Sequence, residues 1–245
     1  MERRALTVPR FTERLVLRPP SAENASAVQE ALEESFASLH VWMDWATTLQ
    51  SLEDTKAILD QARAKYESME EFQVHAFLRD SGSFVLSAWL GARDWRVPKF
   101  EIGYWCRTSM LGKGYATEVV RELTAAAFAE MAANRVEIRC DSRNGRSRRV
   151  AELAGFHLEA ELRCDARAND GSLRDTTVYV LLAQGFDPAA IVSGAAQPLA
   201  DADPAGGRKG RAPGLPSCAR MGGRLPEPPG SIARGRWAAA LTCDV

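Results

Sequence analysis

The chain has 245 residues, 46% of them hydrophobic and 26% charged, enough for one large domain or two small ones with a substantial core. This composition argues against a fully disordered chain, and the net charge of −1 argues against a polybasic nucleic-acid or membrane-surface binder. No apolar run approaches the roughly 20 residues that a membrane helix needs. The charged residues at positions 1–4 have no apolar stretch behind them, so we expect no secretory signal.

The five cysteines are odd in number, widely spaced and without a C-x-x-C pair. This spacing is unlike a disulfide framework or a zinc site and fits a reducing compartment, so we expect a cytoplasmic protein without a metal. The histidines His40, His75 and His157 are isolated in the sequence and indicate neither a metal site nor a catalytic triad.

The first half of the chain predicts one strand, two helices and then three strands. Their limits are marked by Pro19 after the first strand, by Ser21 and Ser51 as helix N-caps, and by Gly82 in a hairpin turn. The expected elements are strand 14–18, helix 22 to about 35, helix 52 to about 69, and strands 73–79, 83–89 and 100–106.

The second half contains the clearest helix signal, an apolar side chain at every fourth position in Tyr115, Val119, Leu123, Ala127 and Met131. A shorter helix follows, with Ser147 as its expected N-cap and Gly155 at its C-terminal end. The expected elements are helix 115–131, strand 136–140, helix 147–154, and strands 157–164 and 173–182. The whole order predicts an α/β domain built on a mixed, mainly antiparallel sheet flanked by helices.

Composition changes sharply near residue 187. Of the 59 residues from 187 to 245, 30 are Pro, Gly or Ala, and Trp237 is the one aromatic residue. A segment with so few large apolar side chains cannot offset its ordering entropy, so we expect one domain at 1–186 and a disordered tail at 187–245. The tail is interpreted either as a mildly basic appendage or as a dispensable extension.

The strongest local feature is a loop of small residues between strand 100–106 and helix 115–131. It consists of Leu111, Gly112, Lys113, Gly114, Tyr115, Ala116 and Thr117. Small residues let backbone N–H groups approach a ligand closely, and a helix N-terminus adds positive partial charge, so the loop predicts a pyrophosphate cradle. The glycine spacing fits neither a Walker A motif nor a dinucleotide fingerprint, and a plain helix-start turn is the alternative.

Six short motifs follow one another between residues 10 and 183. They are 12–18, 101–105, 112–118, Asn144-x-x-Ser147, 154–156 and 173–175. In this order they resemble the GNAT superfamily of acyl-CoA-dependent N-acetyltransferases, and within it the ribosomal-protein N-terminal acetyltransferases of the RimJ/RimL type. The family pattern has Gln or Arg where this chain has Leu111, a departure of little consequence if backbone amides form the cradle.

The resemblance implies acetyl-CoA as co-substrate, no metal, and direct transfer of the acetyl group to an amine rather than through Cys106. Acetyl-CoA would lie between strands 101–106 and 136–140, with the backbone N–H groups of Trp105 and Cys106 directed to the pantetheine arm and thioester carbonyl. Asn144 would bond the pantetheine arm, and Ser147 would donate a proton to the departing thiolate. A purely helix-capping role is the alternative for Ser147.

Glu101 is the first candidate for the general base, acting through water if needed. A strand carboxylate satisfied by an Arg or Lys is the alternative. Some relatives carry a second carboxylate before the last hairpin, where this chain has Ala166 with Asp165 beside it.

The resemblance places one wall of the acceptor groove at Ser35, Leu39, Trp42, Met43 and Trp45. Packing of both tryptophans on the core explains them equally well.

The sequence therefore predicts an acetyl-CoA-dependent N-acetyltransferase whose acceptor is a protein N-terminal α-amine, such as ribosomal Ser or Ala. The alternatives are a small-amine acceptor, for example an antibiotic or polyamine, and an acyl-CoA-binding module without catalysis. We expect a monomer or homodimer that binds neither nucleic acid nor membrane.

Overall fold

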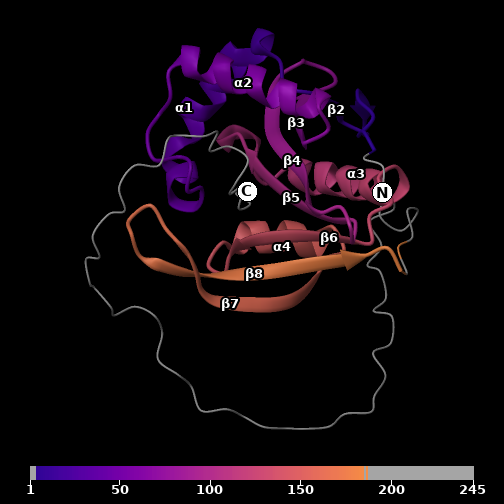
Figure 1. Cartoon of the computed structure of the whole chain (residues 1–245). Coiled ribbons are helices and arrows are strands. Elements are labelled where there is room, and N and C mark those ends of the chain that lie inside the picture. The colour runs from indigo at the N-terminus through magenta and orange to yellow at the C-terminus, as the bar shows by residue number, and fades with distance from the viewer. Residues whose placement is uncertain (1–3, 185, 187–245) are drawn as a thin grey trace, which may run out of the picture.

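The chain folds around one eight-stranded sheet with four α-helices in the part that the computed structural model describes, residues 4–184 and 186 (Figure 1). The predicted tail at 187–245 lies outside the described residues. The strand order is β1-β2-β3-β4-β5-β6-β8-β7, and all neighbours are antiparallel except β5 and β6, which are parallel. The predicted mixed, mainly antiparallel sheet flanked by helices is confirmed.

The elements of the first half are β1 (Arg10–Phe11), β2 (Leu15–Arg18), a 3-10 turn (Ala22–Asn24), α1 (Ala25–Trp42), α2 (Leu52–Glu67), β3 (Glu71–Leu78), β4 (Phe84–Asp94) and β5 (Lys99–Cys106). Those of the second half are a 3-10 turn (Thr108–Met110), α3 (Tyr115–Ala129), β6 (Arg135–Asp141), α4 (Gly145–Leu153), β7 (His157–Arg167) and β8 (Leu173–Leu182). No helix in these described ranges combines the length and apolar content needed to cross a membrane.

Both predicted N-cap serines of the first half act as caps. Ser51 forms a complete capping box at the start of α2, and Ser21 caps the 3-10 turn that leads into α1. α1 continues to Trp42, well beyond its expected end near 35. The reason is that Leu32 and Leu39 keep the apolar period on the buried side of the helix.

The predicted cap of α4 is wrong. α4 begins at Gly145, and its N-cap is Asn144, whose Oδ1 accepts a hydrogen bond from the backbone N–H of Ser147 at 3.1 Å. β4 also extends past its expected end at 89. It can do so because Gly91 leaves room for the Trp89 ring, which a Cβ at that position would meet at 1.9 Å.

Helices cover both faces of the sheet. α3 and α4 pack on one face, in a core that includes Ile102 of β5 and Ile138 of β6. α1 and α2 pack on the other face, against aromatic side chains that include Phe77, Phe84 and Trp105. Side chains that alternate along β5 and β6 therefore point to two different sides of the molecule.

β5 and β6 are paired at one end only. Their register joins Lys99 to Arg135, Phe100 to Val136 and Glu101 to Glu137, and ends there. Beyond this point β5 stays paired with β4, and β6 stays paired with β8, so the two parallel strands diverge. We call this divergence the splay. It lies between the two strands at which the sequence places acetyl-CoA.

Candidate active site

A cavity of about 580 Å³ lies between the start of α3 and the start of α4. Its lining includes Cys106, the small-residue loop at Leu111, Gly112, Gly114, Tyr115, Ala116 and Thr117, and the α4 residues Gly145, Arg146, Arg149 and Val150. The predicted cradle thus forms one wall of a cavity that a second helix completes. Lys113 is exposed, with its Nζ 3.7 Å from the sulfur of Met110, and is not part of this lining.

The loop requires glycine at two positions. Gly112 has φ +73° and Gly114 has φ +80°, both in the left-handed region that other residues adopt at a cost. Gly114 is also the N-cap of α3 and provides no side-chain cap for the first turn. First-turn N–H groups without a side-chain cap favour an anionic ligand, in agreement with the predicted pyrophosphate cradle.

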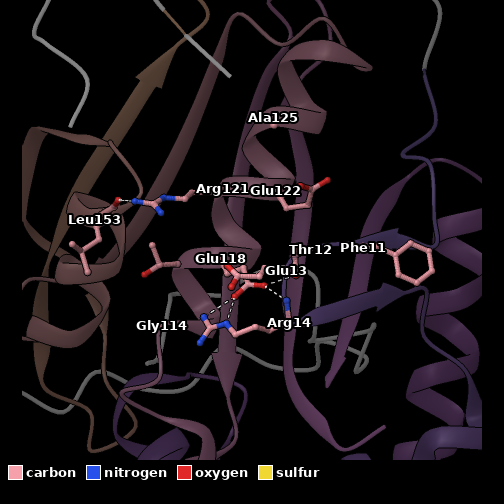
Figure 2. A pocket seen from close by; sticks show the side chains of 11 residues that line it. Phe11, Thr12, Glu13, Arg14, Gly114, Glu118, Arg121, Glu122, Ala125 and Leu153 are labelled. Carbon is pink, nitrogen blue, oxygen red and sulfur yellow. Dashed lines mark hydrogen bonds and ion pairs between the residues drawn. The ribbon is translucent and has the colours of Figure 1, made fainter. Parts of the chain in front are cut away.

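Motif 12–18 holds this loop in place. Glu118, in the first turn of α3, accepts hydrogen bonds from Thr12 Oγ1 and from the Arg14 backbone N–H and Nε (Figure 2). Burial alone would raise the pKa of Glu118, but these bonds outweigh it and keep the pKa below its ordinary value. Arg14 also donates to the Lys113 carbonyl at 2.8 Å and lies over the Tyr115 ring, 4.4 Å from its centroid.

A second cavity, of about 570 Å³, adjoins the first and shares Gly114, Thr117 and Leu153 with it (Figure 2). It follows the outer side of α3 to the turn between β1 and β2. Arg121 donates to the Leu153 carbonyl at 2.6 Å, which ties α3 to the end of α4.

The residues around the first cavity fit the phosphates of acetyl-CoA. Arg146 and Arg149 contribute two positive charges beside the α3 N-terminus. Within the described part of the chain, Arg146 has no carboxylate at ion-pair distance, and Arg149 has only the exposed Glu152 at 3.8 Å. Sequence reasoning missed both arginines, although their i,i+3 spacing directly after the Asn144 cap was a signal for a basic helix face.

Ser147 is fully buried where α4 faces β5. Its Oγ lies 3.3 Å from the hydroxyl of Tyr104, a pair in which either oxygen can donate. Its hydroxyl also interacts with the thiol of Cys140, whose pKa is raised by burial. Asn144 is 2% exposed and serves as the cap described above. The structure therefore brings Asn144 and Ser147 together and adds Tyr104, to which the sequence analysis gave no role.

Only one of the two predicted backbone donors faces the splay. The N–H of Arg107 donates to the Val85 carbonyl of β4 at 2.9 Å. Because N–H groups alternate between the two edges of a strand, the N–H of Trp105 also faces β4, whereas that of Cys106 faces β6. The expectation for Trp105 is corrected accordingly. Cys106 is 5% exposed, and its thiol lies 3.6 Å from the carbonyls of Val85 and Arg107.

A third cavity, of about 710 Å³, lies on the opposite face of the sheet. Most of its lining is charged: Asp44, Arg93, Lys99, Glu101, Glu137, Arg139, Asp165, Arg167 and Arg174, together with Ala166 and Thr176. Glu101 and Glu137 alternate with Ile102 and Ile138, which face α3 and α4, so this cavity and the first are separated by the sheet at the splay.

Glu101 is 3% exposed and pairs with Arg93, whose Nη2 lies 2.7 Å from its carboxylate. Burial raises the pKa of Glu101 above its ordinary value, despite the opposing effect of Arg93. The register places Glu137 directly beside it, paired with Arg135 at 2.6 Å and Lys99 at 3.9 Å. The geometry is compatible with both interpretations of Glu101. An arginine pairs with its carboxylate, and burial shifts its pKa in the direction that suits a general base.

The predicted groove residues are placed differently. Ser35 is 1% exposed, and its Oγ accepts a hydrogen bond from the Thr108 N–H at 3.0 Å. Trp45 is 8% exposed in the core beneath α1, with Leu39 and Met43. This burial favours the packing alternative for these side chains. Trp42 is half-buried, and its carbonyl accepts from Arg174, a residue of the third cavity.

The histidines take no part in the site. His75 is fully buried, and burial lowers its pKa to about 4. His40 Nδ1 lies 2.8 Å from the Ala46 carbonyl, and His157 is exposed at the start of β7. Across residues 4–184 and 186, no group of three or more His, Cys, Asp or Glu residues is placed to hold a metal ion.

Comparison with known proteins identifies the family. Residues 14–157 match the acetyltransferase (GNAT) domain. The chain is 28% identical over 179 residues to "Putative ribosomal N-acetyltransferase YdaF" of Bacillus subtilis (strain 168), covering 73% of this chain and 96% of that protein. RimL, a ribosomal L7/L12 α-N-protein acetyltransferase solved with coenzyme A, has a TM-score of 0.66 at 20% identity, covering 72% of this chain and 98% of that one. RimJ of Mycobacterium smegmatis, solved with CoA-disulfide, has a TM-score of 0.65 at 24% identity, covering 73% and 88%.

The matched domain spans more than half of the chain, so the chain belongs to the GNAT acetyltransferase family. It is an acetyl-CoA-dependent N-acetyltransferase, as the six motifs predicted, and its fold is that of the RimJ/RimL type.

Proposed function

We propose that this enzyme acetylates the α-amino group of a protein N-terminus, such as the N-terminal Ser or Ala of a ribosomal protein. One observation carries the proposal: a buried carboxylate with a raised pKa, Glu101, faces the third cavity where β5 and β6 separate. An α-amine has a pKa near ~8, so it needs modest help from a base, which a carboxylate of raised pKa supplies. The names of RimL and YdaF, both referring to ribosomal acetylation, support the acceptor class.

The cofactor and the acceptor amine reach the splay from opposite faces of the sheet. When bound, acetyl-CoA supplies the acetyl group as a thioester. The loop 112–117 and the arginines of α4 bind its phosphates, and the N–H of Cys106 donates toward the splay. Glu101 takes the proton from the incoming amine on the opposite face, and Ser147 gives a proton to the departing sulfur.

An acceptor screen tests the proposal. Acetyl-CoA is incubated with peptides that begin with Ser or Ala, with polyamines and with aminoglycosides, and free thiol release is measured beside the mass of each product. We expect acetylation at the α-amine of peptides, and loss of most turnover in Glu101→Gln. Acetylation of small amines alone, or of none of the peptides, would overturn the peptide assignment.

A further inference from the structure

Most of the charged side chains of the third cavity pair with one another across its walls. Three ion pairs account for six of its charged side chains: Arg93 with Glu101 at 2.7 Å, Arg139 with Asp165 at 3.0 Å, and Lys99 with Glu137 at 3.9 Å. These pairs join β4 to β5, β6 to β7, and β5 to β6, so they also fix the shape of the cavity. Together the three pairs contribute no net charge to the cavity.

Three charged lining residues remain outside these pairs: Asp44, Arg167 and Arg174. Of the three, Arg167 alone is exposed. It is exposed at the end of β7, lines the cavity, and donates a hydrogen bond to the carbonyl of Gly171 in its own hairpin. Among the described residues, no carboxylate lies within ion-pair distance of its guanidinium. A carbonyl neutralises no charge, so Arg167 presents a positive charge and remaining N–H donors at the rim of the cavity.

The hairpin that carries Arg167 is fixed to the opposite wall of the cavity. Asn169, in the turn between β7 and β8, donates to the carbonyls of His40 at 2.7 Å and Met43 at 2.8 Å. These are carbonyls at the C-terminal end of α1, which lack partners within the helix. Arg167 is therefore held at a defined place beside the cavity.

We propose that Arg167 selects acceptors that carry an acidic side chain within the first few residues after the α-amine. This inference rests on the proposed function, in which the amine reaches Glu101. The cavity then offers a carboxylate at its buried end for the ammonium and a guanidinium at its rim for the acid. Complementary charges of this kind determine specificity more than total affinity, and a guanidinium can bind a carboxylate through two parallel N–H donors.

The test uses peptides that begin with Ser-Ala and differ only at the third or fourth residue, which is Asp, Gln or Lys. We expect kcat/KM to fall in the order Asp, Gln, Lys, by about fivefold between Asp and Gln, the upper range for an exposed ion pair. High salt should reduce the preference, because the pair is exposed to solvent. Arg167→Glu should reverse the order.

Arg163→Glu is the matched control. Arg163 is an exposed arginine on the same strand and does not line the cavity, so its reversal changes the net charge equally and should leave the order of peptides unchanged. Equal use of all peptides by the wild type, or reversal by both variants, would overturn the role of Arg167 while the proposed function stands. Failure to acetylate any peptide would overturn both.

Discussion

At the scale of single residues, we expect Asn144 and Ser147 to have separable roles. Asn144 provides the cap of α4, so Asn144→Ala should cost about 1 kcal/mol of stability, and Asn144→Asp should retain most of it.

Ser147→Ala should instead lower kcat by about 10²-fold, the usual contribution of a proton donor, with little change in the Kd for acetyl-CoA. Steady-state turnover and thermal unfolding of the same preparations check both. A near-normal kcat in Ser147→Ala would show that Ser147 packs in the core and does not donate the proton.

Glu101 gives a prediction with a defined sign. As a base it must be unprotonated, so kcat/KM should fall as pH decreases through the pKa of Glu101, which burial raises. Arg93 favours the charged form, so Arg93→Gln should raise this pKa further and move the acid limb of the profile to higher pH.

The control for Arg93 is Arg96→Gln. Arg96 lies in the same segment, is 89% exposed and pairs with Asp94 rather than Glu101, so its loss should leave the limb in place. The measurement is kcat/KM across pH for the wild type and both variants. If the acid limb of the kcat/KM profile does not move in Arg93→Gln, Glu101 is not the group whose protonation lowers kcat/KM.

At the scale of elements, the start of α4 tests the cofactor cavity better than the loop does. Gly114→Val would strain a backbone at φ +80°, so lost binding could reflect lost structure. The φ of Gly145 lies outside the left-handed region, and a Cβ at this position would meet nothing within 4 Å. Gly145→Leu should therefore place a side chain in the cavity and raise the Kd for acetyl-CoA about 10-fold, a change of about 1.4 kcal/mol.

Gly145→Ala provides the graded control for this cavity. It adds a single carbon and should change the Kd much less than leucine, while both variants keep the wild-type melting temperature or exceed it slightly. Isothermal titration with acetyl-CoA and thermal unfolding check the pair. Equal affinity of the leucine variant and the wild type would place the cofactor elsewhere.

Local signals predicted the elements well because they act over a few residues. The N-cap at Ser51 and the apolar stripe of α3 are each predicted from one short window of sequence, and both are confirmed. The cap of α4 was different, because Asn144 and Ser147 are both cap-type residues three positions apart. Which of the two is the N-cap depends on where β6 ends and the chain turns into α4, and short-range sequence patterns do not determine that position.

At the scale of the whole molecule, we propose that the domain ends at Phe186. Its ring lies 4.5 Å from that of Phe128 on α3, and it packs against the main core. A chain that ends after Phe186 should fold and bind acetyl-CoA like the full chain. A chain that ends one residue earlier should lose about 1 kcal/mol or more, the value of an aromatic pair.

Thermal unfolding and acetyl-CoA titration of the two truncated chains check this boundary. The shorter chain is the control for the longer one, since they differ by one side chain. If the chain that ends after Phe186 has no cooperative transition, the domain extends beyond 186.

The sequence by itself determined the small-residue loop, the family and the order of all helices and strands except the two-residue strand β1, which it missed. These features depend on local hydrogen bonding, periodic burial and motif order. Only the tertiary structure decided how the site is assembled. Arg139 and Asp165 form a pair although they lie 26 residues apart, and Glu101 is beside Glu137 because of strand register. Likewise, the burial of Ser35 and Trp45, and the positive charge of Arg167 at the cavity rim, follow from which elements lie side by side. Such contacts depend on the packing of distant segments, which no short window of sequence specifies.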